Sequence, residues 1–344
     1  MNAPRENIAV IIPCYRVERH IADVLSAIPV EVQQIIVVDD ACPNNSGRVA
    51  LEAFQDNRLI VIRLDENQGV GGATLAGMQI AISKGATLLV KLDGDGQHDP
   101  ADVNRIVQPL LEGKADYCKG NRFFHVQTLK NMPVLRLFGN SVLSFLSKMS
   151  SGYWTLMDPT NGFFAIRSVI IPHLLPAKVE KRYIFESDLL FRLSTLRARV
   201  CEVPIHTVYG DEESGVKPSR MIWPFLRWHT SRTWKRIVYN HFLRGFSLAS
   251  LFLFFGTIML ALGIVAGLGY WIYFISINQS APAGTVMLVG LLLIFGLNFL
   301  LNFVSYDMSA EPKDTIWRNL IDTPSDGDVA FNATYTFISR DGYE

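Results

Sequence analysis

The sequence lacks acidic side chains over a long stretch, because no Asp or Glu occurs from Ser214 to Tyr306. The whole chain of 344 residues nevertheless carries 32 acidic and 32 basic side chains, so its formal net charge is zero. This balance gives no support for a nucleic-acid partner. Chemistry that depends on carboxylates must therefore come from the N-terminal part or from the short C-terminal tail.

Cysteine motifs and a secretory leader are also absent. The four cysteines lie far apart in the sequence: Cys14, Cys42, Cys118 and Cys201. Without a Cys-x-x-Cys pair they match neither a zinc site nor a disulfide framework, so we expect reduced, half-buried thiols. The first apolar run, Ile8–Ile12, is too short for a signal peptide and ends at Pro13. These absences favour a cytosolic location for the N-terminal part.

Long apolar runs are present near the C-terminus. Hydrophobic residues make up 49% of the chain, and the segments 246–277 and 284–306 are almost wholly apolar and uncharged. A membrane-spanning helix needs about 20 such residues, so we expect two transmembrane helices. Lys235, Arg236 and Arg244 precede the pair. Because Lys313 and Arg318 follow it, the positive-inside rule predicts a hairpin in the inner (cytoplasmic) membrane, with both termini in the cytoplasm.

The segment 218–245 is rich in basic and aromatic side chains. Trp223, Trp228 and Trp234 alternate with several arginines and with Lys235. This composition is typical of helices that lie in the lipid headgroup region. A nucleic-acid-binding patch is the alternative, and the apolar hairpin that follows disfavours it. We therefore divide the chain into a catalytic domain (1–217), interfacial helices (218–245), two spans (246–277 and 284–306) and a polar tail (307–344).

The N-terminal part alternates apolar strands with helical segments. The expected strands are 8–12, 34–38, 59–64, 87–92 and 200–208, and the expected helices are 19–28, 44–54, 67–83, 128–149 and 184–196. Continuous apolar strands separated by helices indicate a mostly parallel α/β sheet that is covered on both faces. In such sheets ligands bind beyond the carboxyl ends of the strands.

Polar residues follow the ends of four of these strands. They are Pro13, Asp39-Asp40, Asn67 and Asp93-Gly94-Asp95. Asp93, Asp95 and Gln97 together offer hard oxygen ligands, which suit Mg²⁺ or Mn²⁺ bound with a substrate's phosphates. An acidic Asp-Gly turn taken alone is more often an ordinary surface turn. The convergence of several polar strand ends on one edge is what favours a binding site.

These motifs, taken in order and with the hairpin, resemble the family 2 glycosyltransferases that load a sugar onto polyprenyl phosphate, such as dolichyl-phosphate mannose synthases and bacterial polyprenyl-phosphate glucosyltransferases. The matching segments are 11–15, 38–43, 67–73, 91–97, 120–122, 161–163 and 185–188. The resemblance covers residues 8 to about 306. It implies a GT-A fold, which is a Rossmann-like and mostly parallel sheet, and transfer of a hexose from a GDP-mannose or UDP-glucose type of donor to polyprenyl phosphate.

The resemblance also assigns roles to residues. For the nucleotide sugar it implies Pro13, Tyr15, Asp39, Asp40, Asn67, Gly69, Asp93 and Lys217. For the Mg²⁺ or Mn²⁺ ion it implies Asp93, Asp95 and Gln97. For the acceptor phosphate it implies Arg122, Arg136 and Ser141. For catalysis it implies Asp95, Arg122, Glu186, Asp188 and Arg192. We further expect Tyr209, Glu212, Ser214 and Lys217 to belong to a loop that closes over the diphosphate, and His98 and His206 to be structural.

A phosphate acceptor changes what the enzyme must supply. A phosphate monoester is already largely anionic at pH 7, with a second pKa of about 6, so it needs positioning and charge neutralisation more than a strong base. On this interpretation Glu186 and Asp188 orient the sugar or Arg192. The alternative is that they are ordinary carboxylates on a helix surface with no role in the site. The first loop departs from the family pattern, since Arg16 and Val17 stand where relatives have Asn-Glu and the acid follows at Glu18.

Two other functions remain open from the sequence. A processive polysaccharide synthase would carry a Gln-x-x-Arg-Trp motif, but here Pro224 stands three residues before Arg227-Trp228. A non-catalytic membrane scaffold is disfavoured by the intact set of Asp93, Asp95 and Gln97. The sequence fixes neither the sugar nor the base, and it leaves the oligomeric state open, a homo-oligomer included.

Overall fold

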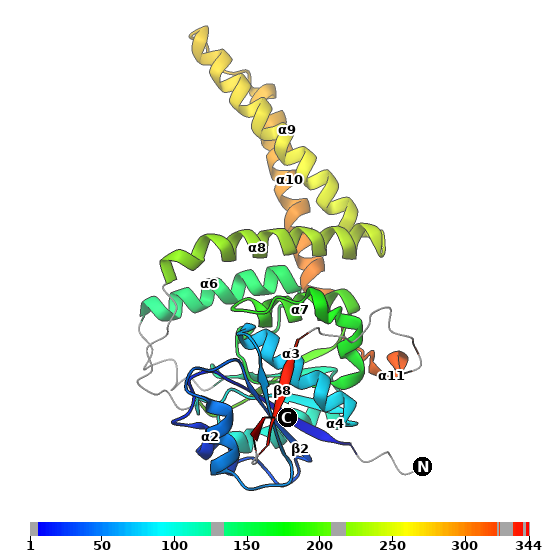
Figure 1. Ribbon diagram of the computed structural model, residues 1–344. Coiled ribbons are helices and arrows are strands. Elements are labelled where there is room, and N and C mark those ends of the chain that lie inside the picture. The colour runs from blue at the N-terminus through cyan, green and yellow to red at the C-terminus, as the bar shows by residue number, and fades with distance from the viewer. Residues whose placement is uncertain are drawn as a thin grey trace. The chain divides into compact units, whose positions relative to one another are not determined.

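A central β-sheet organises the N-terminal part of the chain (Figure 1). The computed structural model describes residues 6–124, 134–207, 218–321, 323, 333–339 and 342–343. The described strands are β1 (Ile8–Cys14), β2 (Gln34–Asp39), β3 (Leu59–Leu64), β4 (Leu88–Lys91), β5 (Tyr117–Asn121), β6 (Phe164–Arg167), β7 (Val200–Pro204), β8 (Tyr335–Ser339) and β9 (Gly342–Tyr343). They lie in the order β7-β5-β6-β4-β1-β2-β3-β8-β9.

The sheet is mostly parallel, as the apolar strand pattern predicts. β1 pairs in parallel with β2 and β4, and β2 pairs in parallel with β3. β6 runs antiparallel to both β4 and β5, while β8 runs antiparallel to β3. The carboxyl ends of β1, β2, β3 and β4 therefore meet at one edge, and the predicted α/β fold class is confirmed.

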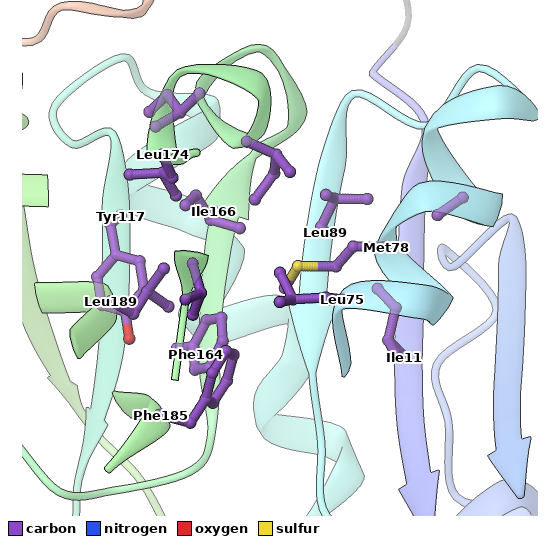
Figure 2. Close-up of a cluster of buried hydrophobic side chains, with 14 of the residues drawn as sticks. Ile11, Leu75, Met78, Leu89, Tyr117, Phe164, Ile166, Leu174, Phe185 and Leu189 are labelled. Atoms are coloured by element: carbon purple, nitrogen blue, oxygen red, sulfur yellow. The ribbon is translucent and has the colours of Figure 1, made fainter. Parts of the chain in front are cut away.

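Helices cover both faces of the sheet. Those of the N-terminal part are α1 (Ile21–Ser26), α2 (Ser46–Ala53), α3 (Gly69–Ser83), α4 (Val103–Leu111), α6 (Val134–Ser151) and α7 (Phe185–Leu196), with short 3₁₀ turns at 100–102, 168–174 and 176–178. One core contains side chains from α3 and α7 against the sheet, and Figure 2 shows part of it, including Met78, Tyr117 and Phe185. A second core on the other face contains side chains of α1 and α4.

Several predicted boundaries shift in the structure. The helix expected at 19–28 is limited to Ile21–Ser26, and the strand expected at 200–208 ends at Pro204. The helix expected at 128–149 begins at Val134 among the described residues. Cys14, Cys42 and Cys118 are fully buried and only Cys201 is half-buried, so the expectation of four half-buried thiols was wrong for three of them. All four are free thiols.

The C-terminal tail contributes to the sheet, which the prediction of a polar tail did not include. It contains α11 (Trp317–Leu320) and the strands β8 and β9. The Asp116 carboxylate accepts hydrogen bonds from the N–H groups of Ile316 and Trp317, and the Arg167 guanidinium lies 3.8 Å from the Trp317 ring centroid. The tail is therefore tied to the sheet at two places, α11 and β8.

The remaining helices are α8 (Pro218–Val238), α9 (Leu248–Ser276) and α10 (Ala283–Ser309), with a π-helical turn at 239–243. Contacts divide the chain into one unit of residues 1–232 and 312–344 and a second of residues 233–311. By length and composition, α9 and α10 are apolar enough to cross a membrane, with mean hydropathies of 2.5 and 2.3. Figure 1 shows them running side by side as a hairpin.

A buried polar cluster lies within the second unit. The Arg236 guanidinium contacts both carboxylate oxygens of Asp307, at 2.7 and 2.9 Å, and the Nε2 atom of His241 lies 2.9 Å from Oδ1 of Asp307. Asp307 is the first acid after the long acid-free stretch. It joins the end of α8 to α10 by a forked ion pair, the geometry that a guanidinium and a carboxylate favour.

Candidate active site

A cavity of about 190 Å³ lies at the carboxyl edge of the sheet. Its lining includes Pro13 and Tyr15 from the loop after β1, Asp40 from the loop after β2, and Asp93 and Asp95 from the loop after β4. The structure thus brings together five residues that the sequence placed at separate strand ends. A polar cavity at this edge is where an open α/β sheet binds its ligand.

The Asp93 carboxylate is held by a buried ammonium group. The Nζ atom of Lys91, the last residue of β4, lies 2.7 Å from Oδ1 of Asp93 and 3.6 Å from Oε1 of Glu186. Burial by itself would raise the pKa of Asp93, but the charge and hydrogen bond of Lys91, together with the charge of Arg122, hold it below its ordinary value. Burial opposes the charge on Lys91 in turn, and Asp93 and Glu186 outweigh it and raise the pKa of Lys91. The cluster therefore favours a charged Asp93.

Gly162 makes room for this ion pair. A β-carbon built there would lie 2.4 Å from Oδ2 of Asp93 and 2.5 Å from Nζ of Lys91. No side chain fits at that distance, so the glycine is required by close approach rather than by backbone conformation. The neighbouring Asn161 orients this loop, because its Oδ1 atom accepts the N–H of Phe163 at 2.9 Å.

The carboxylates can serve a divalent cation only together with other ligands. Among the described residues, no group of three or more His, Cys, Asp or Glu side chains is arranged to hold a metal ion. Asp93 and Asp95 nevertheless line the same cavity, and the Asp95 carboxylate accepts the N–H of Gln97, which fixes the turn. One or two carboxylates completed by substrate phosphates is the usual arrangement for Mg²⁺. The donor set therefore fits Mg²⁺ or Mn²⁺ bound with a diphosphate.

The acidic pair after β2 holds its own loops in place. Both Asp39 oxygens accept backbone N–H groups, from Cys42 at 2.7 Å and Gly47 at 2.8 Å. The Asp40 oxygens accept the N–H groups of Gln68 and Gly69 at 2.7 and 2.9 Å. Burial raises the pKa of Asp40 although these two bonds oppose the shift. Asp40 therefore faces the cavity, whereas Asp39 is fully buried behind it.

The glycine-rich start of α3 packs against the segment that precedes α7. The Lys181 carbonyl accepts the N–H groups of Gly71 and Gly72, and a β-carbon on Gly71 would lie 2.5 Å from the Phe185 ring. The Asn67 side chain donates to the Asp40 carbonyl at 3.1 Å. These glycines therefore permit close helix packing beside the cavity. The predicted contacts of Asn67 and Gly69 with the donor stay predictions.

The Arg122 guanidinium forms a forked ion pair with Asp158. Its Nε and Nη2 atoms lie 2.7 and 2.9 Å from the two oxygens of this fully buried carboxylate. Ser141 lines a second cavity of about 370 Å³, together with Phe123, Phe145, Lys148 and others. Arg122 directly precedes Phe123 but is not itself among the residues that line this cavity. The Arg136 side chain and the 209–217 loop with Tyr209, Glu212, Ser214 and Lys217 lie outside the described residues.

The two acids of α7 point to different places. Glu186 faces Lys91, whereas Asp188 is fully buried and contacts Arg192 at 2.7 Å and Arg232 of α8 at 3.7 Å. Arg192 also donates to the carbonyls of Leu174 and Lys178. Asp188 and Arg192 therefore tie α7 to its surroundings. Their predicted catalytic roles have no support from these contacts.

The sequence is similar to those of known glycosyltransferases. The family model described as glycosyl transferase family 2 matches residues 9–175. A UDP-N-acetylglucosamine–dolichyl-phosphate N-acetylglucosaminyltransferase from Methanococcus voltae is 32% identical over 218 residues, which cover 59% of this chain and 86% of that protein. The chain belongs to glycosyl transferase family 2.

Further relatives support the assignment of this glycosyltransferase to the family. A polyprenol monophosphomannose synthase from Mycolicibacterium smegmatis is 31% identical over 218 residues, covering 62% of this chain and 81% of that protein. Among solved structures, glucosyl-3-phosphoglycerate synthase from Mycobacterium tuberculosis in complex with phosphoglyceric acid aligns with a TM-score of 0.50 and 18% identity, over 67% of this chain and 80% of that one. The last likeness shows the fold alone. The resemblance to polyprenyl-phosphate glycosyltransferases is confirmed.

Several residues of this glycosyltransferase site were missed by the sequence reasoning. They are Lys91, Lys119, Asp158 and Gly162. Lys91 had one visible signal, since it is a charged residue near the end of an expected buried strand, where a lysine is buried only with a partner or a task. Lys119 had none, because it lies in the middle of β5, a strand that the sequence analysis did not predict. Gly162 lay in the matching segment 161–163 without an assigned role, and Asp158 had no signal, because their partners Asp93 and Arg122 are distant in the sequence.

The two histidines differ, since His98 is buried whereas the His206 ring is mostly exposed. His98 stacks on Phe163 with ring centroids 5.5 Å apart, and burial lowers its pKa to about 4. The backbone N–H of His206 donates to Oδ2 of Asp102 at 2.7 Å. The packing of His98 agrees with the structural role expected for it, and the role of His206 stays a prediction.

Proposed function

We propose that this glycosyltransferase transfers a hexose from a nucleotide sugar to polyprenyl phosphate, with inversion at the anomeric carbon and with Mg²⁺ or Mn²⁺, at the cytoplasmic face of the inner membrane. The observation that carries the proposal is the cavity that gathers Asp40, Asp93 and Asp95 at the sheet edge. Relatives whose names specify dolichyl phosphate or polyprenol as acceptor, and two helices apolar enough to span a membrane, support it.

In this proposal an oxygen of the acceptor phosphate attacks the anomeric carbon of the sugar. The bond to the nucleoside diphosphate breaks, and its electron pair leaves with the diphosphate. A divalent ion held by Asp93, Asp95 and Gln97 would stabilise the negative charge on that leaving group. A solved neighbour, glucosyl-3-phosphoglycerate synthase in complex with Mn²⁺ and UDP, is compatible with such an ion.

The surroundings of Glu186 suit an acceptor that needs no deprotonation. Its carboxylate lies 3.6 Å from the ammonium of Lys91, which also neutralises Asp93. The attraction between these opposite charges holds the Glu186 carboxylate beside the cavity edge that Asp93 lines. Glu186 is better placed to accept hydrogen bonds from sugar hydroxyls, while Arg122 and Ser141 receive the acceptor phosphate beside the second cavity.

The acid-free stretch would bring the acceptor to this site. The basic and aromatic side chains of 218–245 would rest in the headgroup region, where cationic groups attract anionic lipid phosphates. Lys217, which lies outside the described residues, would offer a positive charge to the diphosphate. Catalytic domain and both termini would then lie on the cytoplasmic side, as the positive-inside rule requires.

One assay tests the proposal. The full chain is purified in detergent and incubated with a polyprenyl phosphate, Mn²⁺ or Mg²⁺, and in turn UDP-glucose, UDP-N-acetylglucosamine, UDP-galactose and GDP-mannose, each radiolabelled in the sugar. We expect label in the organic phase with one donor, dependent on the metal and on the lipid phosphate. Absence of lipid-linked sugar with every donor overturns the proposal. Hydrolysis of a nucleotide sugar without transfer to the lipid contradicts the claim that polyprenyl phosphate is the acceptor.

A further inference from the structure

We propose that Lys119 is a positioning residue for Glu186, supplying the second buried positive charge that fixes this carboxylate where it orients the transferred sugar. The inference rests on the proposed function. Lys119 lies on β5, a strand that the predicted site residues reach only at Arg122, just beyond its end.

Strand register places Lys119 beside the site. Lys91 of β4 pairs with Phe164 of β6, and Phe164 pairs in turn with Lys119 of β5. Directly paired residues point to the same face of a sheet, so the two lysines flank Phe164 on one face. The Phe185 ring of α7 packs on Phe164 with centroids 6.3 Å apart, as Figure 2 shows, and Glu186 is the next residue.

The ammonium group of Lys119 is buried without a hydrogen-bonding partner. Its exposed fraction is 0%, and within the described part of the chain its Nζ atom has no hydrogen-bond acceptor. The rings of Tyr117 and Phe164 lie 6.0 and 5.8 Å from Nζ, which is cation–π distance. Burial of a charged group without hydrogen bonds costs free energy of folding. Such groups are found mainly where they serve a function.

The charged groups around Lys119 indicate which carboxylate it acts on. Besides Lys91, the groups that act on it are the acids Glu186, Asp158 and Glu202. Asp158 has its own counter-ion in Arg122, and Glu202 accepts the N–H groups of Met157 and Asp158 at 2.8 Å each. Glu186, by contrast, shares Lys91 with Asp93.

The ammonium of Lys91 therefore serves two carboxylates, Asp93 at 2.7 Å and Glu186 at 3.6 Å. Lys119 restores the balance of two positive and two negative charges. Burial lowers the pKa of Lys119 to about 8, against the opposing effect of Glu186. Its charge is consequently present at neutral pH and is lost in mildly alkaline solution.

The test compares transfer rates of full-length wild type, Lys119→Arg and Lys119→Met between pH 6.5 and 9.5, with folding checked by size exclusion and melting temperature. The wild-type kcat should fall as pH rises through about 8, and Lys119→Arg should move that fall to higher pH because arginine stays protonated. Lys119→Met should lose about tenfold or more in kcat at pH 7, with donor KM changed less than about threefold.

Tyr117→Phe is the matched control, because it keeps the aromatic ring that lies 6.0 Å from Lys119 Nζ and removes only a buried hydroxyl on the same strand and face. It should keep the wild-type profile. Superimposable profiles for wild type and Lys119→Arg overturn the inference, as does a wild-type kcat in Lys119→Met. If Lys119→Met does not fold, the Lys119→Arg profile decides. If wild type transfers no sugar at any pH, the proposed function fails and the inference falls with it.

Discussion

The backbone of Gly162 lies so close to the Asp93 carboxylate that a methyl group at position 162 would come within 2.4 Å of Oδ2. Gly162→Ala should therefore push Asp93 away from Lys91. We expect transfer to fall about tenfold or more, because small displacements of reacting groups are costly, and the Mn²⁺ concentration needed for half-maximal rate to rise. Gly290→Ala in α10, which meets no atom within 4 Å, is the control. Wild-type kinetics in Gly162→Ala would contradict the close fit.

Asp95 is predicted to be a metal ligand. Asp95→Asn should lower the transfer rate about a hundredfold or more, because loss of a ligand charge weakens binding of the divalent ion that stabilises the leaving group. The variant should still fold and insert into the membrane. Asp99→Asn, in the same turn, alters a carboxylate that only caps a short helix through Ala101. It should keep most activity. Near-normal rates in Asp95→Asn would remove Asp95 from the metal site.

The forked pair of Arg122 and Asp158 gives a prediction about the acceptor. Arg122→Lys keeps the charge but loses the planar fork, so we expect the KM for polyprenyl phosphate to rise about tenfold with little change in the donor KM. Arg105→Lys, which alters an exposed pair with Asp102, should change neither constant. An unchanged acceptor KM in Arg122→Lys would restrict Arg122 to holding Asp158.

His229 makes stability depend on acid pH. It is buried in α8, its Nδ1 atom lies 2.9 Å from the Ser150 hydroxyl of α6, and burial lowers its pKa from 6.5 to about 4. Between these two pKa values His229 is protonated in the unfolded chain and neutral in the folded chain. Stability is therefore full above pH 6.5 and is lost as pH falls towards 4, by on the order of 3 kcal/mol.

Melting temperatures from pH 4 to 8 measure this effect. His229→Gln should show a shallower decline below pH 6.5 than wild type, because glutamine does not titrate. His206→Gln, at a ring that is 62% exposed, should keep the wild-type slope. Parallel curves for wild type and His229→Gln would refute the assignment.

Ile338 of β8 supports the loop that follows β2. Its side chain is buried in the core on the α1 and α4 side of the sheet, and a β-carbon on Gly47, whose N–H binds Asp39, would lie 3.2 Å from it. Ile338→Ala should cost about 2–5 kcal/mol of stability and raise the donor KM, since the loop carrying Asp39-Asp40 loses its backing. Phe337→Ala, at the neighbouring half-exposed position, should affect the donor KM little. Equal effects of both variants would show that β8 has no special contact with the loop.

Local patterns were enough to predict the sheet and its binding edge. Each of the first four strands is mostly apolar, with Arg63 in β3 and Lys91 in β4 as the basic exceptions, and burial of such a run requires cover on both faces. Asp93 and Asp95 follow such a run directly, so their position depends on adjacent residues alone. The same holds for the two apolar helices of the hairpin.

Long-range contacts account for what the sequence could not supply. The sequence could not distinguish Asp39, whose oxygens bind its own loop, from Asp40, which faces the cavity. Glu186 and Asp188 are two residues apart on α7, yet one faces Lys91 and the other α8, and the pattern alone treats them alike. The pairing of β8 with β3 links residues from opposite ends of the chain, and no local signal reveals it.

The place of β8 in the sheet fixes an order of events during synthesis. β3 emerges from the ribosome early, but its partner β8 is translated only after both helices of the hairpin. Until then β3 presents an open strand edge, which other chains can pair with. Synthesis of α9 and α10 thus precedes completion of the sheet. A nascent chain that stalls before β8 would carry both apolar helices and an unfinished sheet whose open edge is prone to aggregation.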